Sequence, residues 1–428
     1  MANSAGPGVT TVHKRPPLAA LWGIEPARGT IAPTSKVPTL AERGAELVLG
    51  DGVHLRTSGG LPVRLPAEAD WPYWVGELEG WAEQLLSESY RPSATSPDSF
   101  ALRAYYRLRP FIPRSVQILA RRVHARARQH SPTHLRWPID PLFVGIAEAY
   151  LALRILLSPD TRGVTAAPRW PSGYGASAVL THDIEGVAGQ SRCRDVMALE
   201  REAGVRSCFN FVAERYPVDH ALMDEMRADG FEIGSHGIKH DGRKFSSRSV
   251  FDERLERLQH YRKEWRVVGF RSPATHRRWA WMPELPFEYD SSYPDTDPFE
   301  PIPGGCASPW PFMIGRLVEL PVTMPQDHTL WEVLRIPAVP VWRTKLEWLR
   351  ACGGLITIIV HPDYLTTPVR WREYGQLLET LVQTPGLWRT LPGSVAAWWR
   401  ERWSKPGSRA TLERTGAELH LAFEEGAG

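Results

Sequence analysis

The 428-residue sequence has only four cysteines, and no two of them form a C-x-x-C pair. Their positions are Cys193, Cys208, Cys306 and Cys352. Such spacing supports neither a structural zinc knuckle nor a thioredoxin-like redox motif. Four cysteines in a chain of this length are more typical of a reduced, intracellular protein than of a disulfide scaffold, so we expect a cytoplasmic location.

Long apolar runs and a large excess of one charge are also missing. The longest apolar stretch, Leu142 to Leu157, is interrupted by Glu148 and Arg154, whereas a membrane-spanning helix needs roughly 20 apolar residues. Residues 1–23 contain no continuous apolar segment that would indicate a secretory signal. The formal net charge of +3 gives no reason to expect a nucleic-acid partner.

The composition divides the chain into four predicted regions. Residues 1–40 are rich in glycine, proline, serine and threonine, which predicts a flexible arm. Residues 41–175 form a mixed, largely helical region that could serve as a cap over an active site, a dimerisation element or a docking surface. Residues 176–404 carry the pattern of a catalytic domain, and residues 405–428 are expected to form a tail or hairpin.

An arginine-rich stretch lies inside the second region. Residues 98–130 are helix-prone and contain eight arginines. The simplest interpretation is a solvated helix face packed on the main domain. The alternative is a patch for a phosphate-bearing substrate, an anionic carrier or an anionic lipid surface, which would require only peripheral contact and no transmembrane segment.

Short β-prone runs recur from residue 176 onward and alternate with helical patterns, which predicts a parallel sheet with helical crossovers. Seven strands in this length predict an α/β fold, namely a distorted (β/α) barrel with a mainly helical N-terminal extension. An open doubly wound sheet is the alternative. The runs are 177–183, 206–212, 231–236, 267–273, 286–292, 316–322 and 355–362.

Polar residues stand where these apolar runs end, and catalytic groups gather at the carboxyl ends of parallel strands. Asp183 and Glu185 end the first run and point to the same side because side chains in a strand repeat every two residues. Such a pair can divide metal binding and proton transfer between them. His236 and His240 follow the third run, and a helical turn would place both imidazoles on one face. One carboxylate with two histidines is a donor set of catalytic zinc sites.

Further charged side chains follow the later runs. Arg271, after the fourth run, can hold a carboxylate in its ionised form. His361, after the seventh run, can be a satisfied structural histidine or a general acid that faces the metal site. Beyond the sixth run, Asp327, His328 and Trp331 are suited to binding substrate, although they also suit a rim loop that has no such contact.

Four segments, LTHDIEG, GFEIGSHGIKH, GFRSP and IIVHP, occur in an order and spacing that resemble the motifs of the polysaccharide deacetylase superfamily. This superfamily is carbohydrate esterase family 4, with its NodB-homology domain. The resemblance covers about residues 176–400. It implies a distorted (β/α) barrel and metal-dependent N- or O-deacylation, with zinc or another divalent transition metal as cofactor.

The resemblance also implies a role for each matched residue. Asp183 would be the general base, and His361 would be the general acid that protonates the leaving amine. Arg271 would orient Asp183 and tune it. Asp290, in a looser match, would support the site from a neighbouring strand. The implied metal ligands are Glu185, His236 and His240.

The sequence departs from the common pattern of the superfamily at three points. Common members have two adjacent aspartates where this chain has Asp183 and Glu185 separated by one residue. Gly237 replaces the usual serine or threonine after the first histidine, and the arginine motif is one residue shorter before its proline. These changes leave the metal chemistry in place and the substrate open.

The predicted activity is metal-dependent removal of an N-acyl group, expected to be N-acetyl, from an amino sugar or glycan intermediate. In the implied mechanism a metal-activated water attacks the amide, with Asp183 as base and His361 as acid. One alternative is hydrolysis of another non-peptide C–N bond, such as that of a cyclic imide or ureide. A non-catalytic glycan-binding protein is the other.

Overall fold

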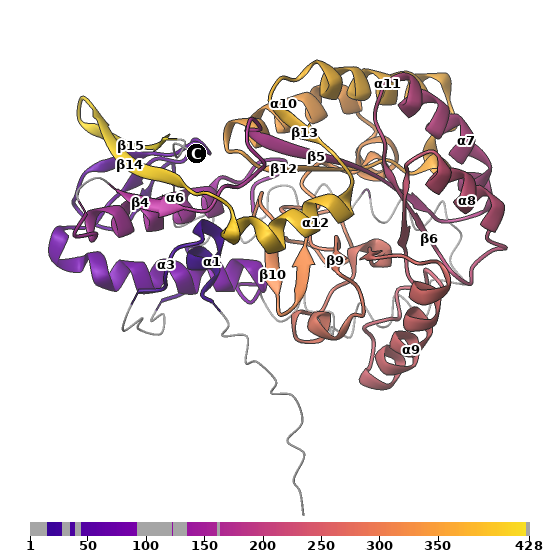
Figure 1. The fold of residues 1–428 in the computed structure, drawn as a ribbon, viewed down its shortest axis with the longest axis horizontal. Helices are drawn as coiled ribbons and strands as arrows, with labels where there is room; N and C mark the ends of the chain where they lie inside the picture. The colour runs from indigo at the N-terminus through magenta and orange to yellow at the C-terminus, as the bar shows by residue number, and fades with distance from the viewer. Residues whose placement is uncertain are drawn as a thin grey trace, which may run out of the picture.

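The computed structural model describes residues 15–27, 35–38, 44–91, 122, 135–160 and 163–424. Apart from Arg122, the arginine-rich stretch predicted at 98–130 lies outside the described residues, as does much of the predicted N-terminal arm. Two sheets organise the described part of the chain. In Figure 1 the smaller sheet is at the left and the larger one at the right.

The larger sheet has the strand order β10-β11-β9-β8-β7-β6-β5-β12, with β13 also paired to β5. All of these pairings are parallel except that of β10 with β11. Each of the seven predicted runs contains one strand, so the α/β prediction is confirmed. The strands are β5 (Ala176–Ile184), β6 (Cys208–Phe211), β7 (Glu232–Ser235), β8 (Gly269–Phe270), β9 (Tyr289–Asp290), β10 (Phe312–Ile314), β11 (Leu317–Glu319), β12 (Leu355–Ile359) and β13 (Leu387–Arg389).

The larger sheet curls into a distorted barrel, as the sequence predicts. Its strands from β5 to β9, and then β11, follow chain order, and β12 returns to the other side of β5. This order is that of a (β/α) barrel and not of a doubly wound sheet, in which the order reverses at a switch point. The segment after β11 approaches β12, where Met324 N donates to Thr357 O at 3.1 Å.

Helices cover the outside of the barrel (Figure 1). Three of them begin at a side-chain cap, because Asp219, Ser247 and Thr367 each accept a hydrogen bond from a backbone N–H of the first turn. The helices are α7 (Val187–Glu202), α8 (His220–Ala228), α9 (Arg248–Glu264), α10 (Ala338–Ala351), α11 (Pro368–Gln383) and α12 (Pro392–Glu401). Shorter turns are η4 (Pro273–Thr275), η5 (Trp279–Glu284), η6 (His328–Leu334), η7 (Pro362–Tyr364) and η8 (Arg402–Ser404).

The smaller sheet joins segments from the two ends of the chain. Its order is β1-β3-β2-β15-β14-β4, and β15 pairs in parallel with β2 so that Leu419 lies opposite Leu55. Strands β14 and β15 form an antiparallel hairpin within residues 405–428. The strands are β1 (Leu47–Val48), β2 (His54–Arg56), β3 (Val63–Arg64), β4 (Val164–Ala166), β14 (Ser408–Thr415) and β15 (Glu418–Glu424).

Three helices, α1 (Pro17–Trp22), α3 (Trp71–Leu86) and α6 (Leu142–Leu156), accompany the smaller sheet, with the turn η1 (Glu68–Asp70) before α3. Helix α6 is mostly buried because its sequence is apolar on nearly every face. Helix α1 lies in the stretch predicted as a flexible arm, so that prediction is wrong for these six residues. Their apolar side chains are buried, and Trp22 Nε1 donates to Ala147 O at 2.9 Å.

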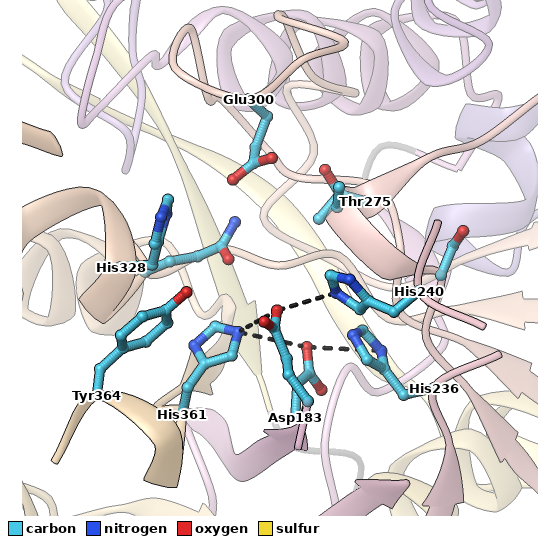
Figure 2. A pocket seen from close by; sticks show the side chains of 12 residues that line it. Asp183, His236, His240, Thr275, Glu300, His328, His361 and Tyr364 are labelled. Carbon is cyan, nitrogen blue, oxygen red and sulfur yellow. Dashed lines mark ion pairs between the residues drawn. The ribbon is translucent and has the colours of Figure 1, made fainter. Parts of the chain in front are cut away.

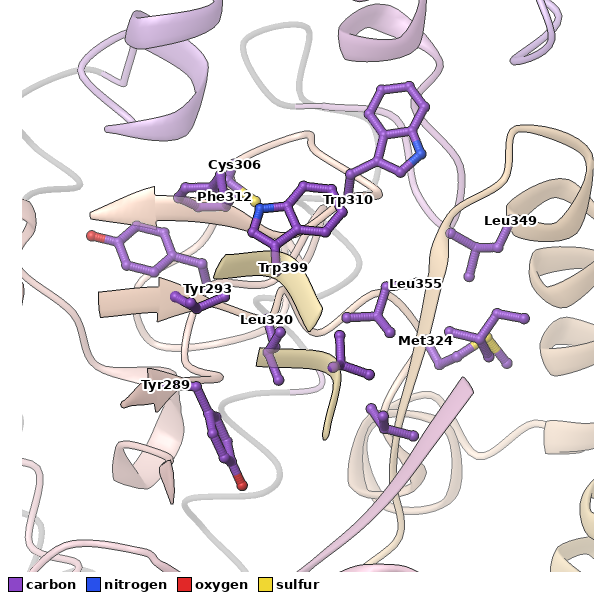
Figure 3. Packing of buried hydrophobic residues seen from close by; sticks show 14 of the residues in the cluster. Tyr289, Tyr293, Cys306, Trp310, Phe312, Leu320, Met324, Leu349, Leu355 and Trp399 are labelled. Carbon is purple, nitrogen blue, oxygen red and sulfur yellow. The ribbon is translucent and has the colours of Figure 1, made fainter. Parts of the chain in front are cut away.

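One apolar core extends from the barrel into the helices of the smaller unit. Figure 3 shows part of this core, which includes Trp310, Trp399 and Leu355. The ring of Trp310 lies 6.4 Å from that of Trp22 and 6.1 Å from that of Phe143, and its Nε1 donates to Gly353 O at 3.0 Å. Trp310 therefore joins α1 and α6 to the barrel.

All four cysteines are buried and free. Within the described residues, no helix combines the length and the apolar character needed to cross a membrane.

Candidate metal centre and active site

Six of the ten predicted site residues line one cavity, at the carboxyl ends of the barrel strands. Figure 2 shows Asp183, His236, His240 and His361 gathered at its base. They follow or end strands β5, β7 and β12. The cavity is lined by Asp183, Glu185, His236, His240, Ser272, Ala274, Thr275, Glu300, Gln326, His328, His361 and Tyr364.

Glu185, His236 and His240 form a group that can hold a metal ion, because one donor atom from each lies within 4.8 Å of the other two. The predicted helical turn between the two histidines is wrong. The chain after β7 is instead a loop with left-handed backbone at Gly237 (φ 78°) and His240 (φ 49°). This loop folds back on itself and places the two imidazole rings 5.2 Å apart.

The chemistry of these donors fits a divalent transition metal. His236 Nδ1 lies 3.1 Å from Arg271 O, and the tautomer assigned from this contact leaves Nε2 free to bind a cation. Both ring nitrogens of His240 are buried without an aligned hydrogen bond, although Nε2 is 2.9 Å from Glu185 Oε1. Two imidazoles and a carboxylate left in this way are a zinc-type donor set.

The electrostatics favour the protonation states that metal ligands need. Burial lowers the pKa of His236 to about 4, which leaves the imidazole neutral. Burial would raise the pKa of Glu185, but His240 outweighs it and holds this pKa well below its usual range. Asp363 supports Glu185 from behind, since its carboxylate accepts hydrogen bonds from the backbone N–H groups of Glu185 and Gly189, both at 3.1 Å.

Asp183 is buried and fixed through one of its two oxygens. Oδ1 accepts hydrogen bonds from Asn210 Nδ2 at 2.8 Å and from Arg271 Nη1 at 3.2 Å. Oδ2 lies 3.8 Å from His236 and 3.9 Å from His361 Nε2. Burial would raise the pKa of Asp183, but His236, Arg271 and His361 lower it to about 2. Asp183 is therefore ionised, with one oxygen directed to its histidine neighbours.

The guanidinium of Arg271 is itself held in place. It donates to Ser291 O at 2.8 Å and to Thr181 Oγ1 at 2.6 Å, in addition to Asp183. These contacts fix the guanidinium beside the Asp183 carboxylate; its role in orienting that carboxylate stays a prediction. Asn210 was not identified from the sequence, although it is the one amide in the apolar run of the second strand.

His361 faces the cavity with Nε2 and is held from behind by Asp327. Asp327 Oδ1 lies 2.7 Å from His361 Nδ1, and Oδ2 accepts the backbone N–H of His361 at 2.7 Å. Burial would lower the pKa of His361, but the Asp327 carboxylate raises it to about 10. The imidazole is thus protonated at neutral pH and carries an Nε2–H near Asp183.

The three residues predicted to bind substrate have different places. His328 lines the cavity, as Figure 2 shows. Asp327 is fully buried beneath His361, so its predicted contact with substrate is not supported. Trp331 is not among the lining residues, because it lies in η6 with its Nε1 bound to Glu373 at 2.7 Å. Sequence analysis missed Tyr364, Gln326 and the other uncharged lining residues, which have no motif to identify them.

Asp290 lies in β9, fully buried, and does not line the cavity. Its Oδ1 accepts a hydrogen bond from Ser292 Oγ at 2.7 Å. Burial raises its pKa. Burial and Asp290 together raise the pKa of Glu319 well above its usual range. These two carboxyl groups interact within the sheet, so Asp290 contributes to the structure under the site and not to its surface.

Comparisons with known proteins give structural likenesses only. No protein-family model matches the chain, and no curated protein matches it. One similar solved structure is described as a polysaccharide deacetylase from Mycobacterium smegmatis (21% identity, 59% of this chain and 99% of that one, TM-score 0.44). Another, from Pseudomonas aeruginosa PAO1, carries the same description (18% identity, 55% and 94%, TM-score 0.43). A third is PuuE allantoinase (16% identity, 55% and 93%, TM-score 0.44).

Proposed function

We propose that this protein is a metal-dependent hydrolase that removes an N-acyl group, expected to be N-acetyl, from an amino sugar or glycan intermediate. One observation carries the proposal. A three-residue group able to hold a metal lies in the same cavity as an ionised carboxylate and a protonated imidazole, whose facing atoms are 3.9 Å apart. Amide hydrolysis needs this combination of a carbonyl-polarising group, a base and an acid.

The metal would be held by Glu185, His236 and His240, with zinc as the expected ion. When bound, such an ion polarises a carbonyl group and lowers the pKa of a coordinated water molecule. Asp183 accepts the proton of the attacking water at Oδ2, since Oδ1 is occupied by Asn210 and Arg271. Arg271 keeps this carboxylate ionised and correctly oriented.

His361 supplies the second proton transfer. An amine is a very poor leaving group unless its nitrogen is protonated, and His361 Nε2–H faces the same space as Asp183 Oδ2. Asp327 fixes the imidazole through Nδ1 and stabilises its charged form. We therefore assign Asp327 as a positioning residue for the acid.

A second candidate is hydrolysis of a cyclic imide or ureide, and the size of the cavity favours it. The free volume is about 40 Å³, which is small beside the roughly 300–1,000 Å³ of common ligand sites. A compact ring fits this space more readily than a glycan chain does. Either reaction uses the same base, acid and metal ligands.

The test combines metal analysis with hydrolysis assays on the full-length protein. Metal content is measured by mass spectrometry, and turnover of N-acetyl-D-glucosamine and hydantoin is measured before chelation, after chelation and after zinc is restored. Asp183→Ala should abolish turnover. Asp224→Ala is the matched control, because Asp224 is an exposed aspartate on α8.

The outcomes separate the two candidates. Acetate release that depends on zinc and on Asp183 supports deacylation of an amino sugar. Opening of hydantoin without acetate release supports the second candidate instead. If the zinc-loaded protein hydrolyses neither compound, or Asp183→Ala is as active as the wild type, the hydrolase proposal fails.

A further inference from the structure

Three uncharged residues of the cavity wall have polar atoms without partners. Ser272 Oγ, Thr275 Oγ1 and Gln326 Nε2 are buried, and none has a hydrogen-bond partner in the part of the chain that the structure describes. All three residues line the cavity that contains the metal-binding group. Buried polar groups are normally paired, so a cluster of unpaired ones at a concave site indicates atoms that a ligand satisfies.

The backbone holds the Thr275 hydroxyl group in place at a conformational cost. Ala274 and Thr275 both have left-handed backbone, with φ of 52° and 51°, which is unfavourable for a β-branched residue such as threonine. Thr275 N donates to Ser272 O at 3.0 Å, and Thr275 O accepts from Arg277 Nη1 at 2.9 Å. Arg277 is in turn bound to the buried Glu88 of the N-terminal region.

Gln326 is positioned by the segment that also holds the proposed acid. Gln326 directly precedes Asp327, which is bound to His361. Its backbone O accepts from Leu330 N at 3.1 Å, and Trp342 Nε1 donates to the preceding Pro325 O at 2.8 Å. In Figure 2, His328 and Tyr364 lie across the cavity from Thr275 and His240.

We propose that Ser272, Thr275 and Gln326 form a polar recognition subsite that determines substrate specificity. This inference rests on the proposed function. Gln326 Nε2 can only donate, so it requires an acceptor oxygen on the substrate, whereas the two hydroxyl groups can donate or accept. The subsite therefore selects a compact amide that carries hydroxyl or carbonyl oxygens beside the scissile bond and rejects an apolar amide of equal size. Sites built in this way discriminate strongly, because an analogue without the oxygen leaves buried groups unpaired.

Binding can be measured without turnover in a full-length Asp183→Asn protein supplied with zinc. The two probes are N-acetyl-D-glucosamine and N-cyclohexylacetamide, which share a six-membered ring and an acetamide but differ in their oxygens. Calorimetry should give a Kd for the sugar at least about tenfold lower than that for the apolar probe. Gln326→Met, Thr275→Val and Ser272→Ala, added singly, should each weaken sugar binding about three- to tenfold and leave the apolar probe unchanged.

Thr329→Val is the matched control. Thr329 Oγ1 is also buried without a hydrogen-bond partner in the described chain, but Thr329 does not line the cavity. Its removal should change neither Kd. If a subsite variant unfolds on melting analysis, Gln326→Glu keeps the shape of the side chain, removes the donor and should show the same loss.

Each result has a defined meaning. Equal affinity for the two probes, no sugar binding, or an equal loss in Thr329→Val overturns the subsite. Selective sugar binding together with absence of hydrolysis by the wild type leaves the subsite in place and refutes the proposed function. Hydrolysis of the sugar with no loss of affinity in the subsite variants refutes the subsite alone.

Discussion

The barrel and the smaller unit of this protein both bury acidic side chains, but different groups surround those side chains. At the end of the larger sheet, Asp183 and Glu185 face histidines and an arginine, and these neighbours hold both pKa values below the usual range. Between the helices of the smaller unit, Glu79 accepts hydrogen bonds from Leu18 N at 2.7 Å and Ala19 N at 2.8 Å. Burial outweighs these contacts and raises the pKa of Glu79 to about 7.

Glu148 on α6 behaves in the same way as Glu79. It accepts the N–H of Ser58 at 2.9 Å, and burial raises its pKa. Even with an arginine nearby, Arg154 for Glu79 and Arg169 for Glu148, these contacts do not compensate for the loss of water around the carboxylate. The histidines and the arginine around Asp183 and Glu185 do. Asp183 and Glu185 are therefore ionised near neutral pH and able to bind a metal or accept a proton, whereas Glu79 and Glu148 act as structural hydrogen-bond acceptors.

The largest expected effect tests this division of roles through catalysis. Asp183→Asn should lower kcat by about 10³-fold or more, because the base is lost. Glu79→Gln, the same type of change in the smaller unit, should leave kcat within about twofold. Both are measured by acetate release at neutral pH. A large loss of kcat in Glu79→Gln with an intact fold would contradict the comparison.

Metal affinity should show the next largest effect. His240→Ala removes one of three donors and should weaken zinc binding by about 100-fold or more, as measured by competition with a chelating dye. His260→Ala, an exposed histidine on α9, is the control and should bind zinc normally. Equal zinc affinity in the two variants would show that Glu185, His236 and His240 do not form a metal centre.

A smaller effect is expected on the pH profile. Asp327 raises the pKa of His361 to about 10, so the acid stays protonated and activity falls only as the pH rises through that value. Asp327→Asn lowers this pKa, which moves the alkaline limb of kcat/KM toward neutral pH. The loss should be about tenfold greater at pH 9 than at pH 6. Glu373→Gln, a carboxylate that binds η6 elsewhere, should leave the profile unchanged.

The smallest effect concerns the stability of the smaller unit. The pKa of Glu79 is raised from 4.5 to about 7 in the folded protein, so its contribution is present below pH 4.5 and is lost as pH rises through 7. Between these values the wild type should lose on the order of 3 kcal/mol relative to Glu79→Gln. Urea unfolding at pH 5 and pH 8 measures the difference. A difference between the two proteins that does not vary with pH would show that Glu79 stays ionised.

Local sequence patterns were sufficient to predict the barrel strands and to single out the charged residues that end these strands. Each of the seven runs is a strand because apolar, β-prone residues fill positions that are buried on both faces. Asp183, Glu185, His236, His240, Arg271 and His361 could be singled out because polar residues stand out against such runs.

Other residues of the site do not stand out from their neighbours in the sequence in this way. Asp327 was identified, but not its contact with His361, because those residues are 34 positions apart. Ser272, Thr275 and Gln326 are common polar residues, and only their burial at one cavity distinguishes them. The loop between His236 and His240 depends on left-handed backbone, which residue spacing does not reveal.

The sequence by itself determined the strand periodicity, the order of the charged strand ends and the chemical types available for catalysis, since these depend on neighbouring residues. The tertiary structure decided which charges meet, and therefore which carboxylates are ionised. It also decided that β2 and β15, more than 350 residues apart, share one sheet. The physical reason is common to both: electrostatic environment and strand pairing depend on contacts between segments that are distant in the chain.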